Sequence, residues 1–135
     1  MKSLIIFIFL FCLVGCDRFP EGCNKFTHRY ILLKNNSKLD IYYTNDIKKD
    51  DNLLKLKRQR KLNPDSQSKF TLAYNNCWEV NFKNVNFINF YFYDASILEN
   101  NKWEDVVKNN LGILDSIRVD LDYLQKNNWT VTYPK

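Results

Sequence analysis

The chain has 135 residues, with 20 Lys and Arg against 15 Asp and Glu, which gives a formal net charge of +5. Hydrophobic residues make up 45% of it and aromatic residues 16%, so it has the material for a buried core, and its length fits one domain. It contains only 3 Gly and 3 Pro, no internal repeat and no low-complexity tract, which argues against long flexible linkers.

The first fifteen residues have the pattern of a secretory signal peptide. Lys2 supplies a positive charge, and residues 4–14 form an unbroken apolar run that stops at Gly15. The core of a signal peptide takes about 7–15 residues, whereas a membrane-spanning helix needs about 20. No Ala precedes Ala73, so the site that ordinary signal peptidase prefers is missing. We therefore favour a removed signal over residues 1–15, rather than an uncleaved anchor or a plain secretory signal.

Leu13-Val14-Gly15-Cys16 ends this run and resembles the lipobox of bacterial lipoproteins. The resemblance implies transfer of a diacylglyceryl group to the Cys16 sulfur, cleavage after Gly15, and acylation of the new amino group. One acyl chain binds a membrane only marginally, but two or three on one residue hold a protein there stably. We expect a protein of the bacterial cell envelope whose membrane partner is reached through acyl chains on Cys16. The outer membrane is the expected site, on either its periplasmic or its surface face.

Residues 16–25 are expected to be the lipidated N-terminus and tether, and residues 26–135 a single globular domain. Cys12 leaves with the signal, so Cys23 and Cys77 remain. An even pair in an oxidising compartment favours one disulfide over two free thiols. Such a crosslink typically stabilises a fold by about 2–4 kcal/mol.

Alternating apolar and polar residues predict β-strands along most of the domain. Residues 27–34 and 39–44 are expected to form a hairpin about the turn 35–38, because Asn tolerates the positive φ of tight turns. Asn63-Pro64-Asp65 is a second turn signal. Residues 87–93 are almost wholly apolar and aromatic, which predicts a central strand covered on both faces. Further strands are expected at residues 69–74, 78–82, 113–119 and 129–133.

Two short helices are expected among the later strands. Asn101 could cap the first, with Trp103 and Val106 on its inner face. Asp120 could cap the second, with Leu124 directed inward. The expected fold is mostly β or α+β: an antiparallel sheet or small sandwich of about six or seven strands with two short helices.

Several short motifs follow one another in a fixed order between residues 28 and 134. They are His-x-Tyr-Ile, Asn-Asn-Ser, Ile-Tyr-Tyr, Phe-Tyr-Phe-Tyr-Asp, Trp-Glu-Asp-Val, Asp-Leu-Asp-Tyr-Leu and Asn-Trp-Thr-Val-Thr-Tyr-Pro. Together with the lipobox, this order resembles a group of small lipoproteins of Bacteroides-type bacteria. The resemblance implies an envelope location and assigns no catalytic residue. Asp115-Ser116-Ile117 also resembles the short O-glycosylation signal of exported proteins in such bacteria.

Residues 48–61 hold a local excess of positive charge, with seven basic residues against two acidic ones. A patch for an anionic surface or an acidic envelope protein would consist of Lys55, Lys57, Arg58, Arg60 and Lys61. A solvated loop explains the same charges and is favoured, because blocks of like charge are usually solvated. Nucleic acid is not an expected partner of an exported protein.

Candidate catalytic groups are few. His28 is the only histidine, so it cannot form a two-histidine site, and a structural use is favoured. Paired carboxylates can hydrolyse glycosides, and the candidates are Asp94, Glu99, Glu104 and Asp105. Solvated faces and helix-start charges explain these four more simply and are favoured. There is no Gly-rich phosphate loop and no Cys–His set with zinc spacing, so neither a cofactor nor a metal is expected.

These features favour a lipid-anchored envelope protein whose domain is a non-catalytic binding or structural module. Its expected partner is the membrane surface or another envelope protein. The alternative is a small hydrolase that acts on envelope polymers through paired carboxylates.

Overall fold

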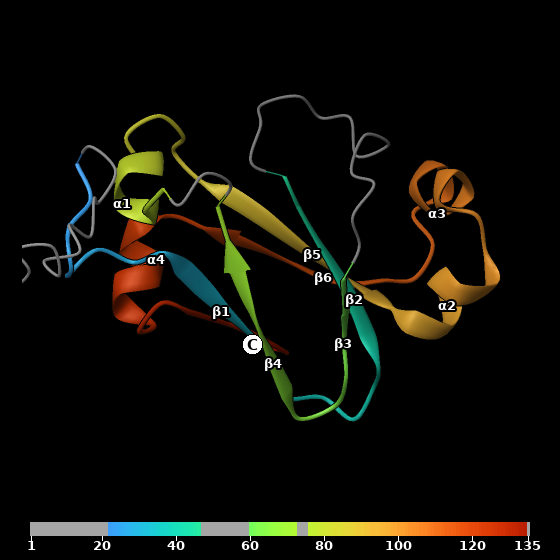
Figure 1. Cartoon of the computed structure of the whole chain (residues 1–135). Helices are drawn as coiled ribbons and strands as arrows, with labels where there is room; N and C mark the ends of the chain where they lie inside the picture. The colour runs from blue at the N-terminus through green and yellow to red at the C-terminus, as the bar shows by residue number, and fades with distance from the viewer. Residues whose placement is uncertain (1–21, 47–59, 73–75, 135) are drawn as a thin grey trace, which may run out of the picture.

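The computed structural model describes residues 22–46, 60–72 and 76–134. These residues form two β-sheets and four short helices (Figure 1). The strands are β1 (Tyr30–Asn35), β2 (Ile41–Asp46), β3 (Arg60–Leu62), β4 (Ser66–Thr71), β5 (Ile88–Asp94), β6 (Ile113–Val119) and β7 (Thr130–Tyr133). The helices are α1 (Trp78–Asn81), α2 (Ala95–Asn100), α3 (Trp103–Asn109) and α4 (Leu121–Lys126). The expected class, an α+β fold made mostly of sheet, is confirmed.

The two sheets have the strand orders β4-β1-β7 and β3-β2-β5-β6. Every neighbouring pair is antiparallel except β1 and β7, which run parallel with Leu32 opposite Thr130 and Leu33 opposite Val131. The strands are therefore antiparallel, as expected, apart from this one parallel pair. A parallel pair needs a long connection, and here most of the domain lies between the two strands. This pairing brings the last strand beside the first.

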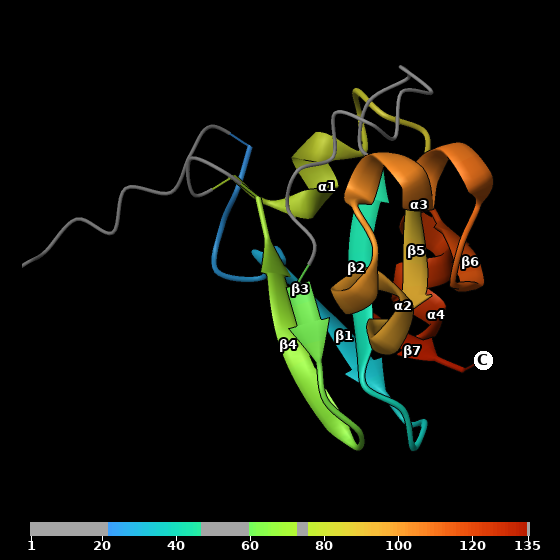
Figure 2. The same ribbon diagram turned by 90° about the vertical axis from the view of Figure 1, so that its right-hand side faces the viewer.

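The expected hairpin of residues 27–34 and 39–44 is also wrong, because β1 and β2 belong to different sheets. Asn35 ends β1 and is fully buried, so its side-chain amide needs hydrogen-bond partners. Its Nδ2 donates over 2.8–3.1 Å to the carbonyl oxygens of Leu39, Leu62 and Asn63. The connection is thus a corner that carries the chain from one sheet to the other (Figure 2).

The turn at Asn63-Pro64-Asp65 is confirmed, and it forms a second corner, between β3 and β4. Asp65 has a positive φ of 52°, which Asp adopts more readily than most residues. Lys38 Nζ lies 2.9 Å from Asp65 Oδ2 and so links the two corners. Because the β1–β2 and β3–β4 connections lie beside each other, the two sheets pack face to face.

The core lies between the sheets and is closed by α1 and α4. Its buried members are Ile31, Leu33, Ile41, Tyr43, Leu62, Phe70, Trp78, Ile88, Phe90, Phe92, Ile117, Val119, Leu124 and Val131. Rings from opposite sheets meet here, since Phe70 and Phe90 lie edge to face with centroids 5.3 Å apart. The strand expected to be central is confirmed as central, because β5 lies between β2 and β6. One of its faces is fully buried, and the other is half-buried except at Tyr93, which is buried as well.

Residues 78–81 form helix α1, with Phe82 as its C-cap, instead of the strand expected over residues 78–82. The apolar residues at 78, 80 and 82 fit a strand, but positions 78 and 82 are also one helical turn apart. In the helix, the rings of Trp78 and Phe82 lie on one face with centroids 6.0 Å apart. Trp78 is fully buried, so the helical choice places the largest side chain of the segment in the core.

The later helices differ from the expectation in number and in one cap. Asp94 begins the unexpected helix α2 by accepting a hydrogen bond from Ser96 N at 2.8 Å. Asn101 does not cap α3: Lys102 stands at that position, and the Asn101 amide donates to Ile97 O. Asp120 does cap α4, accepting from Tyr123 N at 2.7 Å, and Leu124 is buried as expected.

Within the three described ranges, no helix is both long enough and apolar enough to cross a membrane. The expected signal over residues 1–15 and the expected lipidation site at Cys16 lie outside those ranges. The same is true of residues 47–59, which contain most of the basic segment.

Candidate functional site

A disulfide holds the beginning of the domain. Cys23 and Cys77 are bonded; their Cα atoms are 5.9 Å apart, and their sequence separation is 54. The expected pairing is therefore confirmed. Cys77 immediately precedes α1, so the bond fixes the first described residues against this helix.

Beyond the disulfide the chain makes a tight turn over residues 24–27. Thr27 N donates to Asn24 O, and Asn24 N donates to Thr27 Oγ1 at 3.0 Å. Phe26 N donates to Asn24 Oδ1 at 2.8 Å, and Thr27 Oγ1 donates to Asn24 O at 2.7 Å. Asn commonly organises turns through such side-chain bonds to the backbone. The turn leaves the Phe26 side chain 77% exposed.

His28 and α1 are joined by reciprocal hydrogen bonds. The His28 backbone N–H donates to both carboxylate oxygens of Glu79, at 3.0 and 3.1 Å, and the ring Nδ1 lies 2.7 Å from Glu79 Oε1. In return, Trp78 N donates to His28 O at 2.9 Å. Because a carboxylate only accepts, Nδ1 carries the proton that it shares with Glu79. The ring is thereby fixed in one orientation.

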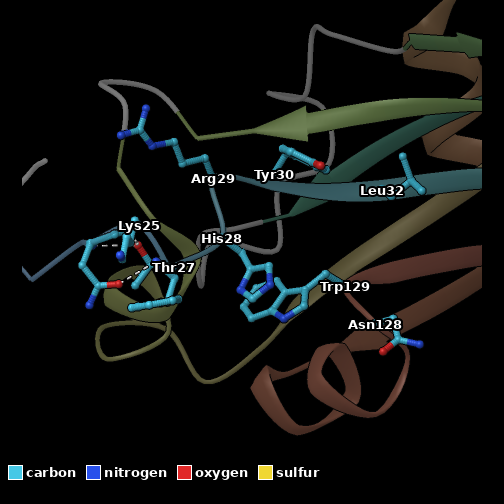
Figure 3. A pocket seen from close by; sticks show the side chains of 10 residues that line it. Lys25, Thr27, His28, Arg29, Tyr30, Leu32, Asn128 and Trp129 are labelled. Carbon is cyan, nitrogen blue, oxygen red and sulfur yellow. Dashed lines mark hydrogen bonds between the residues drawn. The ribbon is translucent and has the colours of Figure 1, made fainter. Parts of the chain in front are cut away.

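The other contact of this ring comes from the far end of the chain. The His28 ring stacks on the Trp129 indole, with centroids 3.8 Å apart and planes 11° from parallel (Figure 3). Trp129 is held by its backbone, since its N donates to Leu124 O and its O accepts from Leu32 N. Both Asn128 and Trp129 have positive φ, at 50° and 57°. This conformation is unusual for a bulky residue, and it turns the chain from α4 into β7.

A groove of about 630 Å³ lies between the turn over residues 24–27, strand β1 and the α4–β7 connection at Asn128 and Trp129 (Figure 3). Its lining residues are Asn24, Lys25, Phe26, Thr27, His28, Arg29, Tyr30, Leu32, Asn128 and Trp129. The lining thus combines aromatic rings with basic side chains, and none of these ten residues is acidic. A volume of this size lies in the range of ligand sites.

Basic side chains at this end of the molecule lie over aromatic rings. Lys25 Nζ is 5.0 Å from the centroid of the Phe26 ring, and Lys69 Nζ is 4.5 Å from that of Tyr30. Lys69 belongs to β4 and reaches Tyr30, a lining residue of the groove, because β4 pairs with β1. Such cation–π contacts attract the ammonium group without neutralising its charge. The groove and its rim are therefore positively charged and aromatic together.

The basic patch expected from residues 48–61 is described only in part. Lys55, Lys57 and Arg58 lie outside the described residues, and Arg60 is exposed at the start of β3. Lys61 Nζ lies 2.8 Å from Glu99 Oε1 and 3.2 Å from Asp40 Oδ2. These hydrogen bonds raise the pKa of Lys61, and the bond with Glu99 has the larger effect. The charge of Lys61 is therefore balanced within the domain.

The four carboxylates expected for the alternative enzyme have separate surroundings. Asp94 caps α2, and its hydrogen bonds with Ser96 lower its pKa. A glycosidase acid needs a raised pKa instead. Glu99 pairs with Lys61, whereas Glu104 and Asp105 are exposed in the first turn of α3.

A smaller cavity of about 140 Å³ lies beside α2 and α3, lined by Tyr42, Leu98, Glu99 and Trp103. It contains one carboxylate, that of Glu99, whereas the hydrolase hypothesis needs two at one cleft. Tyr93 packs against Trp103 with ring centroids 5.5 Å apart, and burial raises the pKa of its hydroxyl to about 12. These two rings give α3 an aromatic support.

Other expectations concern modification and metals. Ser116 is exposed on β6, which is an edge strand, and its glycosylation stays a prediction. No group of three or more His, Cys, Asp or Glu side chains within the described ranges is arranged to hold a metal ion.

Sequence reasoning missed the groove although one signal for it was present. His28 lies five positions after Cys23, and Glu79 lies two positions after Cys77. The expected disulfide therefore already placed these two side chains in the same neighbourhood. Trp129 had no such signal, because it reaches His28 only through the parallel pairing of β7 with β1.

Comparison of this chain with protein-family models, with curated proteins and with solved structures gives no match.

Proposed function

We propose that this chain is a lipid-anchored protein of the bacterial cell envelope, and that its domain is a non-catalytic binding module. Its anchor is the set of acyl chains on Cys16, and its binding surface is the groove around His28 and Trp129. The position of the groove carries the proposal. It is built on the first residues of the domain, only a few positions from the proposed anchor.

The rigidity of the groove supports binding. The disulfide, the turn over residues 24–27 and the three bonds that Glu79 accepts all fix its wall before any ligand arrives. Binding sites are usually preformed in this way, because ordering a flexible loop at the moment of binding costs free energy.

Stacking and hydrogen bonding are the chemistry that this groove offers. Nδ1 of His28 is committed to Glu79, which leaves Nε2 for a hydrogen bond with a ligand. The nearby Thr27 hydroxyl donates to Asn24 O and is part of the turn, so it is not directed toward His28 as a nucleophile would be. These assignments favour a module that binds over one that reacts.

The anchor is tested on the full chain expressed in an envelope-forming bacterium. Wild-type protein should fractionate with membranes, lack residues 1–15, and carry diacylglyceryl and acyl mass on Cys16. Cys16→Ala should remain an unlipidated precursor, whereas Cys12→Ala, a matched change within the apolar run, should be processed like wild type. A mature N-terminus without acyl mass would overturn the proposal.

A further inference from the structure

The turn over residues 24–27 exposes an aromatic ring that the fold does not use. Phe26 is 77% exposed, although a Phe side chain in contact with water loses the free energy that burial would supply. The backbone beneath it is fully organised by bonds between Asn24 and Thr27. The exposure of this ring is therefore built into a rigid turn. It is not the chance position of a loose end.

Positive charge surrounds this ring. Lys25 lies over Phe26 itself, and Lys69 lies over Tyr30, which is 42% exposed farther along the same wall. Arg29, between them in sequence, is exposed as well. No acidic residue lines the groove beside them. Exposed aromatic rings flanked by Lys and Arg are the combination that suits the boundary between lipid headgroups and acyl chains.

The length of the tether fixes what this surface faces. Seven positions separate Cys16 from Cys23, so a fully extended chain spans about 25 Å at most. The disulfide joins Cys23 to the start of α1, so the domain cannot lengthen this tether by unwinding its first residues. The end of the molecule that carries residues 22–30 must then stay near the bilayer, while α2 and α3 lie at the opposite end (Figure 1).

We infer that the wall formed by residues 24–30, together with Lys69, docks on the anionic headgroup layer of the membrane that holds the anchor. This inference rests on the proposed function, because only the acyl chains on Cys16 bring the wall to a bilayer. Phe26 enters the layer between headgroups and acyl chains. Lys25 and Lys69 contact lipid phosphates, and the cation–π contacts hold both ammonium groups at the same level as the rings.

Depth-dependent quenching of the full lipidated protein tests this orientation. Phe26→Trp places a reporter on the turn, and Leu39→Trp places a matched reporter on an exposed apolar residue at the β1–β2 corner. Both variants keep the native tryptophans, so each is compared with wild type. In anionic vesicles whose lipids carry bromine near the headgroups, the emission added by Trp at position 26 should be largely lost. The emission added at position 39 should be retained.

The contribution of charge is tested in the same Phe26→Trp protein. Lys25→Gln combined with Lys69→Gln should restore part of the lost emission in anionic vesicles. The matched pair Lys102→Gln and Lys108→Gln, at the start and end of α3, should not. Equal quenching in the two double variants would overturn the contact between these lysines and phosphate.

Three other outcomes would also be decisive. Acyl mass on Cys16 with no quenching at position 26 would refute the docking inference and leave the proposed function intact. A mature protein without acyl mass would refute both. Shielding of position 26 in native envelopes but not in protein-free vesicles would make the partner a protein, and the lipid inference would be wrong.

Discussion

Lys25 and Lys69 lie over the rings of Phe26 and Tyr30 at the end of the molecule where the described domain begins. On the side that carries α2, Lys61 lies between Asp40 and Glu99. All three lysines are basic residues on or beside the same two sheets. Their surroundings nevertheless differ in whether they leave the positive charge of the lysine available to a partner outside the domain.

An aromatic ring attracts a cation through its quadrupole and carries no net charge, so the ammonium group keeps its full charge toward a second partner. Two carboxylates more than neutralise one ammonium group, so the immediate surroundings of Lys61 carry a net negative charge. The excess of lysine and arginine in residues 48–61 suggests a patch that includes Lys61, although a solvated loop is favoured for it. Of these three lysines, Lys25 and Lys69 keep their charge for a partner outside the domain, whereas the charge of Lys61 is balanced within it.

The largest effect is expected when the first region loses its covalent support. Replacing Cys23 and Cys77 together by Ser should lower the free energy of unfolding by about 2–5 kcal/mol, because the unfolded chain regains the freedom of a loop of more than fifty residues. Thermal unfolding followed by circular dichroism measures the loss. Hydrogen exchange should show residues 24–32 losing protection before β5 and β6 do. Equal melting of the double variant and wild type would contradict the role given to this bond.

A smaller loss is expected when only the hydrogen bonds behind His28 are weakened. Glu79→Gln keeps the shape of the side chain but removes the charge from an acceptor of three bonds. Charge-assisted hydrogen bonds contribute about 1.5–3 kcal/mol, and Gln retains one acceptor, so a loss of about 1–2 kcal/mol is expected. Denaturant unfolding measures it. Glu104→Gln, a matched change on the exposed first turn of α3, should change stability by less than about 0.5 kcal/mol.

The α2 side offers a test through its N-cap. Asp94→Ala removes the acceptor for Ser96 N and should lower stability by about 0.5–2 kcal/mol. The lowered pKa of Asp94 gives this contribution a pH dependence. It should be complete above the ordinary pKa of the carboxyl group and disappear as the pH falls through the lowered value.

Asp94→Asn keeps an acceptor that does not titrate, and it separates the charge of the cap from its shape. The difference in melting temperature between wild type and Asp94→Asn should shrink as the pH is lowered from about 6 through the ordinary pKa of a carboxyl group and then through the lowered pKa of Asp94. A difference that stays constant over this range would show that the charge of Asp94 does not stabilise α2.

Much of the fold was predictable from local patterns. The alternation of residues 113–119 and the cap at Asp120 involve neighbours in sequence, and both were identified correctly. The corner at Asn35 was not, because two of the three carbonyl groups that its amide reaches belong to Leu62 and Asn63. The local sequence Asn35-Asn36-Ser37 is compatible with a tight hairpin as well as with a corner. The hydrogen bonds to these distant carbonyl groups stabilise the corner.

The candidate site divides in the same way. Its disulfide followed from counting cysteines, and that bond implies the neighbourhood of His28 and Glu79. Residues 78–82 were assigned to a strand because alternation cannot be distinguished from an i, i+4 pair over five residues. The strand would have placed Glu79 and Trp78 on opposite faces of a sheet, whereas helix α1 directs one to His28 and the other to the core.

The smallest effect on stability is expected from a change beside Lys61. Its result shows whether the two carboxylates hold the charge of this lysine. Because its bonds to Glu99 and Asp40 raise its pKa, the Lys61 ammonium group gives up its proton less readily than an ordinary lysine does. Only the neutral amine reacts with an acetylating reagent, so Lys61 should be labelled slowly at mildly alkaline pH. Glu99→Gln removes the larger of the two causes, and labelling of Lys61, measured by peptide mass spectrometry, should become faster.

Stability should hardly change in Glu99→Gln, since exposed ion pairs contribute little. Glu104→Gln, which has no bond to Lys61, should leave the labelling rate as it is. If Glu99→Gln also leaves the labelling rate unchanged, the charge of Lys61 is not neutralised by these carboxylates. Lys61 would then be available to bind an anionic partner.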